Sequence, residues 1–258
     1  MDSPLRSFAS LYSTTFLMVL AAGLLTTYLG LSLTNMDVPQ IWIGGMMSAY
    51  YIGLVCGSKV GHKLIAQVGH IRAFVACAGI VTASALGHAL IDNLTVWLVL
   101  RLAVGMGMMC QYMVLESWLN EQAETNQRGT VFASYMIVSY LGLMAGQGAI
   151  SLYPDLGIEP LLLIAICFAL CIVPIAITRR IHPEPLTPAP LKMGHFWLRA
   201  PQALSTVALG SMIVGCFYGL APSYATAKGI DPEHVAMYMS CTILAGLLAQ
   251  WPMGKLSD

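Results

Sequence analysis

Long apolar runs alternate with short polar connectors along almost the whole chain. A bilayer core about 30 Å thick is crossed by roughly 20 apolar residues in a helix, and each run is long enough to do so. We expect helices, because lipid cannot satisfy the backbone N–H and C=O groups of an isolated extended segment. The runs that we assign as spans are 11–34, 40–60, 73–91, 95–117, 130–153, 158–178, 203–225 and 233–253.

The connectors between these runs carry residues that break helices. Most are short: NMDVP, GHKLIAQVGHI, DN, NEQAETNQRG, YPDLG and AKGIDPEH. One connector, over 179–202, is long and holds five prolines, which is typical of an extended, solvated linker. The pattern predicts an N-terminal six-helix block over 1–178, a cytoplasmic linker over 179–202, and the first two helices of a second block over 203–258.

The composition agrees with a chain that lies in a bilayer. Hydrophobic residues make up 57% of the sequence and charged residues only 9%, whereas a soluble domain has roughly a quarter charged residues. The formal net charge is zero, so no nucleic-acid partner is expected. The fold class that follows is an all-α membrane protein.

The few charges are distributed unevenly between the two sides. With the N-terminus in the cytoplasm, the outer loops hold one cation, Lys228, and Arg101 lies within a span. Cytoplasmic loops of membrane proteins are enriched in lysine and arginine, so we expect a cytoplasmic N-terminus. The ten inner cations are Arg6, Lys59, Lys63, Arg72, Arg128, Arg179, Arg180, Lys192, Arg199 and Lys255.

The first two runs resemble the last two. The stretch GLLTTYLG (23–30) parallels GLAPSYAT (219–226), which pairs Gly23 with Gly219 at an offset of 196. Membrane helices share a limited alphabet, so a chance match is the alternative. Parallel repeats about an axis normal to the membrane occur in transporters. A complete second block would give roughly twelve helices, and this chain would then lack the last four.

Two motifs carry a resemblance to a known family. After the eighth run, Gly254-Lys-Leu-Ser-Asp258 is similar to the G-x-x-x-D-[RK]-x-G loop signature of the major facilitator superfamily. In the corresponding loop after the second run, Gly69 and Arg72 fit the end of the motif, but no acidic residue stands at the aspartate position. Arg101-Leu-Ala-Val-Gly-Met-Gly107 resembles the R-x-x-x-G-x-G pattern of the fourth span.

Longer segments are most like the YcaD-like branch of bacterial transporters in this superfamily; they are ESWLNEQAETNQRG, FYGLAPSY and QWPMGKLSD. The resemblance implies secondary active transport of a small-molecule substrate by alternating access in the bacterial inner membrane. It also implies a monomer that needs no cofactor, with protons as a candidate coupling ion.

Polar residues within the spans are the candidates for substrate contacts. A charge at mid-membrane is expensive and is a functional-site hypothesis by default. Arg101, Tyr112 and Glu116 form one helical stripe, with Gln111 beside it, and Arg101 and Glu116 lie roughly 22 Å apart along the axis. The resemblance implies that the first, fourth and seventh spans line the cavity, which adds Tyr28, Tyr218 and Tyr224 as candidates.

Each of these residues also has a simpler interpretation. Arg101 contacts a substrate anion or takes part in proton coupling, or it is a structural arginine that bonds carbonyl groups of a neighbouring span. The tyrosines can be residues of the interfacial belt. For the glycines at 53, 57, 61, 142 and 146, and for Gln147 after them, we predict a role in close helix packing.

The inner gate has its own candidates. Glu116 either forms a conformation-dependent ion pair with Arg72 or Arg128, or makes an ordinary interfacial pair. The loop motifs add Gly69, Gly254 and Asp258 as gate residues.

An all-α membrane protein of this kind can be a transporter, an intramembrane enzyme or a non-transporting scaffold or sensor. An intramembrane enzyme needs a nucleophile with a base, a metal pair or clustered carboxylates; we assign no catalytic and no metal-binding residue and expect no enzymatic activity. A non-transporting membrane scaffold or sensor with the same fold is the alternative to a transporter. The internal repeat and the stripe at Arg101 favour transport.

Overall fold

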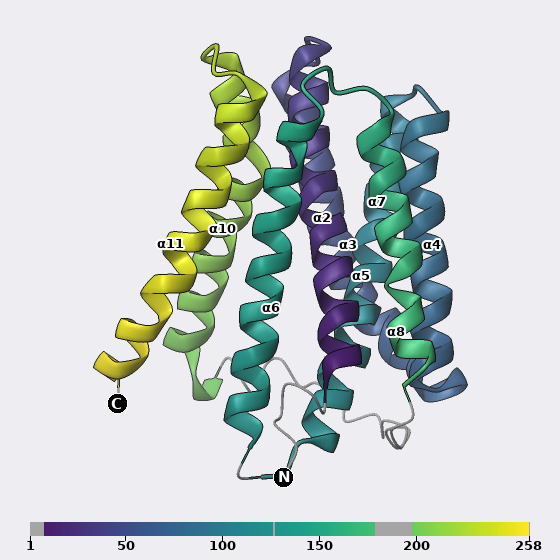
Figure 1. The fold of residues 1–258 in the computed structure, drawn as a ribbon, viewed down its shortest axis with the longest axis vertical. Coiled ribbons are helices and arrows are strands. Elements are labelled where there is room, and N and C mark those ends of the chain that lie inside the picture. The colour runs from purple at the N-terminus through teal and green to yellow at the C-terminus, as the bar shows by residue number, and fades with distance from the viewer. Residues whose placement is uncertain (1–7, 126, 179–197, 258) are drawn as a thin grey trace.

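The protein is a bundle of long helices that lie side by side, as Figure 1 shows for the computed structural model, which describes residues 8–125, 127–178 and 198–257. No strand forms within these ranges. The helices are α2 (Ala9–Asn35), α3 (Gln40–Val68), α4 (His70–Leu90), α5 (Leu94–Gln122), α6 (Arg128–Gly148) with the 3-10 turn η1 (Ala149–Leu152), α7 (Glu159–Leu170), α8 (Ile172–Ala176), α10 (Pro201–Ala227) and α11 (Pro232–Ser257).

The described residues contain seven helical segments that are long and apolar enough to cross a membrane. They are α2, α3, α4, α5, α6 with η1, α7 with α8, and α10. Helix α11 corresponds to the eighth apolar run and lies beside α10 (Figure 1). The prediction of an all-α membrane protein is confirmed.

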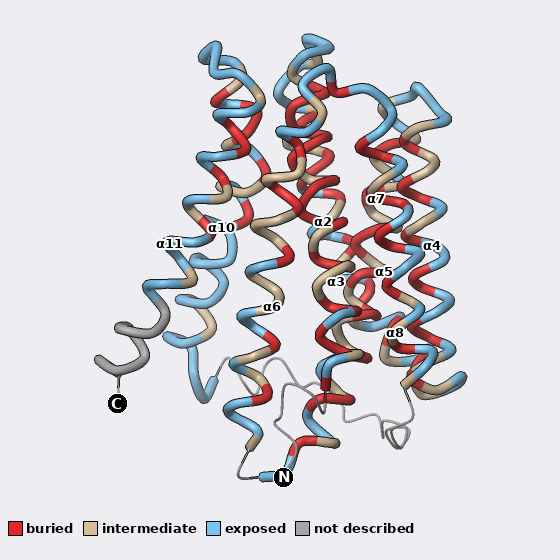
Figure 2. Tube along the Cα trace, in the orientation of Figure 1, coloured by how far each residue is buried: buried red, intermediate tan, exposed pale blue. Residues whose placement is uncertain are grey.

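Helix α2 is the central helix of the bundle. In its most apolar stretch of 18 residues 72% are buried inside the protein, compared with 11% for α10. Figure 2 shows the same contrast, because buried positions gather along α2 and its neighbours while the N-terminal half of α10 is exposed. The core therefore lies among α2 to α7.

The expected polar connector GHKLIAQVGHI is almost entirely helical, so its assignment as a loop is wrong. Helix α3 continues to Val68 and α4 begins at His70. Gly69 alone separates them, with a φ of +84°, a backbone conformation that glycine adopts without steric penalty. The turn is tight because one residue both ends α3 and begins α4.

The sixth apolar run is also divided. Helix α7 ends at Leu170 and α8 resumes at Ile172. Pro174 explains the interruption, because proline has no N–H to donate to the carbonyl of Leu170 and its ring crowds that carbonyl.

Close packing between helices depends on glycine, as predicted. On α3, a Cβ atom added to Gly57 would lie 2.6 Å from the carbonyl oxygen of Met106 on α5. On α6, a Cβ added to Gly142 would lie 2.8 Å from the carbonyl oxygen of Phe16 on α2. Small residues allow helix backbones in membranes to approach this closely. These two crossings fix α3 against α5 and α6 against α2.

Helices α10 and α11 contact the preceding helices mainly at one end of the bundle. The Ser223 hydroxyl donates to the carbonyl of Gly30, at 2.9 Å, and the Ser240 hydroxyl donates to the carbonyl of Met144, at 3.3 Å. Gly30 and Met144 lie near the ends of α2 and α6, opposite the chain's N-terminus in Figure 1. Toward the other end α10 is mostly exposed, over 201–214. Residues 179–197 of the predicted linker lie outside the described residues.

Candidate functional site

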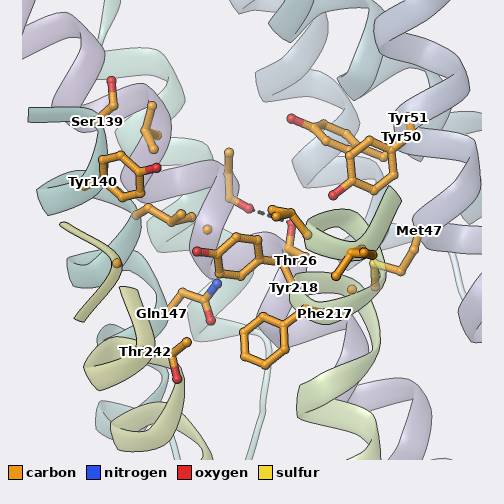
Figure 3. A pocket seen from close by; sticks show the side chains of 18 of the residues that line it. Thr26, Met47, Tyr50, Tyr51, Ser139, Tyr140, Gln147, Phe217, Tyr218 and Thr242 are labelled. Carbon is orange, nitrogen blue, oxygen red and sulfur yellow. Dashed lines mark hydrogen bonds between the residues drawn. The ribbon is translucent and has the colours of Figure 1, made fainter. Parts of the chain in front are cut away.

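A cavity of about 650 Å³ lies between α10 and α11 on one side and α2, α3, α5 and α6 on the other. Its volume is in the range of small-molecule sites. The wall is largely apolar and aromatic (Figure 3). The aromatic side chains that line it are Tyr50, Tyr51, Tyr112, Tyr140, Phe217 and Tyr218.

Arg101 is the single charged residue among the described residues that line this cavity. Its side chain is 1% exposed. The guanidinium carbon lies 4.8 Å from the centroid of the Tyr50 ring, a cation–π contact. No carboxylate among the described lining residues compensates the charge.

The hydrogen bonds of Arg101 are weak. Nη2 lies 3.4 Å from the Thr26 hydroxyl and 3.9 Å from the Met47 sulfur, and the buried Nε has no partner. None of its described hydrogen bonds goes to a carbonyl of a neighbouring helix, which is the arrangement expected here for a structural arginine. The fold therefore buries a cation and leaves part of its donor capacity unused.

Gly105 brings Tyr50 to Arg101. It lies one helical turn after Arg101 on α5, and a Cβ there would collide with the backbone carbonyl of Tyr50. The absence of a side chain lets α3 approach α5 at this level, so the Tyr50 ring lies over the guanidinium. The R-x-x-x-G spacing of the sequence thus builds the cation–π contact.

Three of the six predicted cavity residues line the cavity: Arg101, Tyr112 and Tyr218. In Figure 3 the Tyr218 ring extends from α10 toward Gln147.

The other three lie elsewhere. Gln111 is fully buried, with its amide nitrogen 3.8 Å from the Cys171 sulfur. Tyr28 is buried among the core residues of α2 but is not part of the cavity wall. Tyr224 is 66% exposed.

Several residues of the wall are not among the cavity candidates that the sequence indicates. Gln147, assigned to packing, lines the cavity and accepts a hydrogen bond from the Thr27 hydroxyl at 3.0 Å. Tyr50, Tyr51 and Tyr140 were not identified, although a pair of adjacent tyrosines in the middle of an apolar run is a signal that was available.

Glu116 lies on α5 and accepts a hydrogen bond from the Tyr135 hydroxyl of α6, at 3.2 Å. Within the described ranges it forms no ion pair with Arg72 or Arg128. Arg72 lies in the first turn of α4 and Arg128 is the first residue of α6. Of the other gate candidates, Gly69 forms the turn between α3 and α4, Gly254 lies within α11, and Asp258 is outside the described residues.

The chain matches a known protein family over nearly its whole length. The family model described as Major Facilitator Superfamily matches residues 5–258. The chain belongs to the major facilitator superfamily.

Two curated relatives of this superfamily member are named as MFS-type transporters, and their names state no substrate. An "Uncharacterized MFS-type transporter Ent638_1421" from Enterobacter sp. (strain 638) is 29% identical, over 94% of this chain and 64% of its own length. An "Uncharacterized MFS-type transporter YcaD" from Escherichia fergusonii is 26% identical, over 98% of this chain and 67% of its own length. The chain thus spans about two thirds of these relatives, and the resemblance to the YcaD-like branch is confirmed.

The cavity of this superfamily member is formed by more helices than the resemblance implied. Residues of the first, fourth and seventh spans, α2, α5 and α10, line it as expected. Helices α3, α6 and α11 contribute as well, and they supply four of the residues described above: Tyr50, Tyr51, Tyr140 and Gln147.

Proposed function

We propose that this protein is a secondary active transporter that carries a small solute through the cavity at Arg101 by alternating access. The observation that carries the proposal is the buried, incompletely bonded Arg101 in a cavity between two groups of helices. Membership of the superfamily and the transporter names of the relatives support it. The site residues of the proposal are Arg101, Tyr50, Tyr112, Gln147 and Tyr218.

The proposed moving parts are the six-helix block over 1–178 and the block that begins with α10, joined by the linker at 179–202. The contacts of α10 and α11 near Gly30 and Met144 support a closed end of the cavity. We propose that the opposite end, where residues 201–214 are mostly exposed, is the open one. The uneven distribution of lysine and arginine supports a cytoplasmic N-terminus in a bacterial inner membrane. With this orientation the open end faces the cytoplasm, and we propose that this arrangement represents the inward-facing state of the cycle.

Solute flux tests the proposal against a membrane scaffold or sensor. The protein at its full native length is reconstituted into proteoliposomes, and uptake of a panel of labelled anionic, neutral and cationic solutes is measured. We expect accumulation of at least one solute above the level of protein-free vesicles when a proton gradient is imposed, and loss of this accumulation when the gradient is dissipated. Uptake no greater than in protein-free vesicles for every solute would favour the scaffold.

The pair Glu116–Tyr135 supports a proposed role at the inner gate. In the proposed open state the Tyr135 hydroxyl donates a hydrogen bond to the carboxylate of Glu116; we propose that closure transfers this carboxylate to Arg72 or Arg128. Glu116→Gln removes the latch and is expected to keep the inner end open. Tyr135→Phe frees the carboxylate and is expected to favour closure.

Cysteine labelling measures this balance. A cysteine introduced at Ser139, which lines the cavity, serves as the reporter in a background without the seven native cysteines. We expect Glu116→Gln to raise and Tyr135→Phe to lower the labelling rate from the cytoplasmic side, each about fivefold for a hydrogen bond of about 1 kcal/mol. Unchanged rates in both variants would make Glu116 an ordinary surface group.

A further inference from the structure

We propose that the transported solute is a small organic monoanion with an aromatic or apolar body, whose carboxylate-type group binds Arg101. This inference rests on the proposed function and names the chemical class of its substrate. It follows from the charge, the unused hydrogen-bond donors and the wall of the cavity.

The charge of Arg101 selects an anion. A buried, unpaired cation costs several kcal/mol, and a paired one is tolerated. Arg101 has a hydroxyl and a thioether as hydrogen-bond neighbours, at 3.4 and 3.9 Å, together with an unpartnered Nε. A carboxylate accepts two parallel hydrogen bonds from a guanidinium, a geometry that neither existing neighbour provides. The same positive charge repels a cationic solute.

The aromatic and aliphatic wall of the cavity favours a solute whose uncharged part is aromatic or apolar. Tyr50, Phe217 and Tyr218 present rings to the cavity, and Ile213 and Val214 add aliphatic surface. A sugar or another polyhydroxylated solute would bury hydroxyl groups without partners along such a wall, which is unfavourable. An aromatic ring or a short alkyl chain packs against it without this loss.

The number of cations limits the charge of the solute. Among the described residues of the wall, Arg101 is the single cation, and the remaining polar side chains include Thr26, Ser139, Gln147 and Thr242. A dianion would pair one charge with Arg101 and find no counter-ion for the other among the described residues of the wall. The single charge of a monoanion is paired when its acidic group binds the guanidinium of Arg101.

Met47 is a weak hydrogen-bond neighbour of Arg101 that an anion can displace, and it also packs against α10. Its thioether is a weak acceptor and its unbranched side chain adapts easily, so an arriving carboxylate oxygen can replace it at Nη2. The same side chain packs against α10, where a Cβ on Gly219 would lie 2.8 Å from the Met47 Cγ. Met47 therefore contacts both Arg101 and α10, which belong to the two groups of helices.

Matched pairs of probes test the charge requirement. Thermal unfolding of the purified full-length protein, followed by tryptophan fluorescence, is measured with benzoate against benzamide and with hexanoate against hexanamide, at constant ionic strength. The members of each pair differ mainly in charge. We expect at least one carboxylate to bind about tenfold or more tightly than its amide. Benzylamine and phthalate extend the series to a cation and a dianion, and we expect both to bind more weakly than benzoate.

Substitutions of Arg101 test whether this residue causes the preference for the carboxylate over the amide. Arg101→Gln is expected to abolish the preference for the carboxylate, and Arg101→Lys, which keeps the charge without the planar fork, to retain a reduced preference. Arg199→Gln, at an exposed arginine outside the cavity wall, is the control and should bind as the unmodified protein does. The comparison of Arg101→Lys with the unmodified protein remains informative if Arg101→Gln fails to fold.

The outcomes separate this inference from the proposed function. If each amide, or benzylamine, binds as tightly as the carboxylates, the anion assignment is wrong. Gradient-driven uptake of a neutral or cationic solute would likewise overturn it and leave transport intact. Absence of uptake for all solutes would overturn transport itself. Carboxylate binding that is unchanged in Arg101→Gln would overturn the assignment to Arg101.

Discussion

Arg101→Ala is expected to reduce transport by about 100-fold or more while the protein still inserts into the membrane. The loss of one partner from a buried charge pair costs roughly 2–5 kcal/mol, and about 2.7 kcal/mol corresponds to two decades in rate. In the absence of solute Arg101 has weak partners, the Thr26 hydroxyl and the Met47 sulfur. Its removal therefore affects substrate binding more than it affects the fold.

Initial uptake rates in proteoliposomes measure this effect, with the amount of protein in the membrane and its thermal unfolding as parallel readouts. Arg199→Ala serves as the matched control, because it removes an exposed arginine beside the start of α10. Transport that persists at the level of the control would remove Arg101 from the mechanism. A large loss of thermal stability together with the loss of transport would instead support the structural interpretation of this residue.

Gly105→Ala is expected to destabilise the protein by about 1–3 kcal/mol, the usual range for overpacking, and to impair transport as well. The added Cβ would collide with the carbonyl of Tyr50 and with the backbone at Gly53 and Leu54. Backbone atoms cannot rotate away as a flexible side chain can, so α3 and α5 must separate. This movement takes the Tyr50 ring away from Arg101, whose guanidinium it covers.

Two glycines in the same fold provide matched controls for this prediction. A Cβ at Gly44 or Gly79 would meet no atom within 4 Å, and alanine is favoured over glycine within a helix by up to about 1 kcal/mol. We expect Gly44→Ala and Gly79→Ala to unfold at the same temperature as the unmodified protein or slightly above it. Equal unfolding temperatures for Gly105→Ala and the two controls would show that the crossing of α3 and α5 does not depend on Gly105.

The sequence predicted the spans because their length and apolar composition are set by the bilayer and not by the neighbouring helices. It also placed Arg101 at the site, since a charge within an apolar run has few tolerable positions. The predicted end of the second span at residue 60 is wrong, because His62, Lys63 and Gln67 are polar residues of a segment that the pattern assigns to a connector. In the structure they continue the helix as far as Gly69, where the positive φ ends it.

The sequence by itself determined that this is an all-α membrane protein, where its main spans lie and which span carries a buried cation. Only the tertiary structure decided which face of each helix meets the cavity: it placed Gln147 and Tyr50 in the wall and Gln111 in the core. The physical reason is that lipid and protein interior are about equally apolar, so a membrane helix shows no strong hydrophobic asymmetry between its faces. The facing sides are fixed by the close approach of backbones at glycines such as Gly57, Gly105 and Gly142, which becomes visible only when both helices are in place.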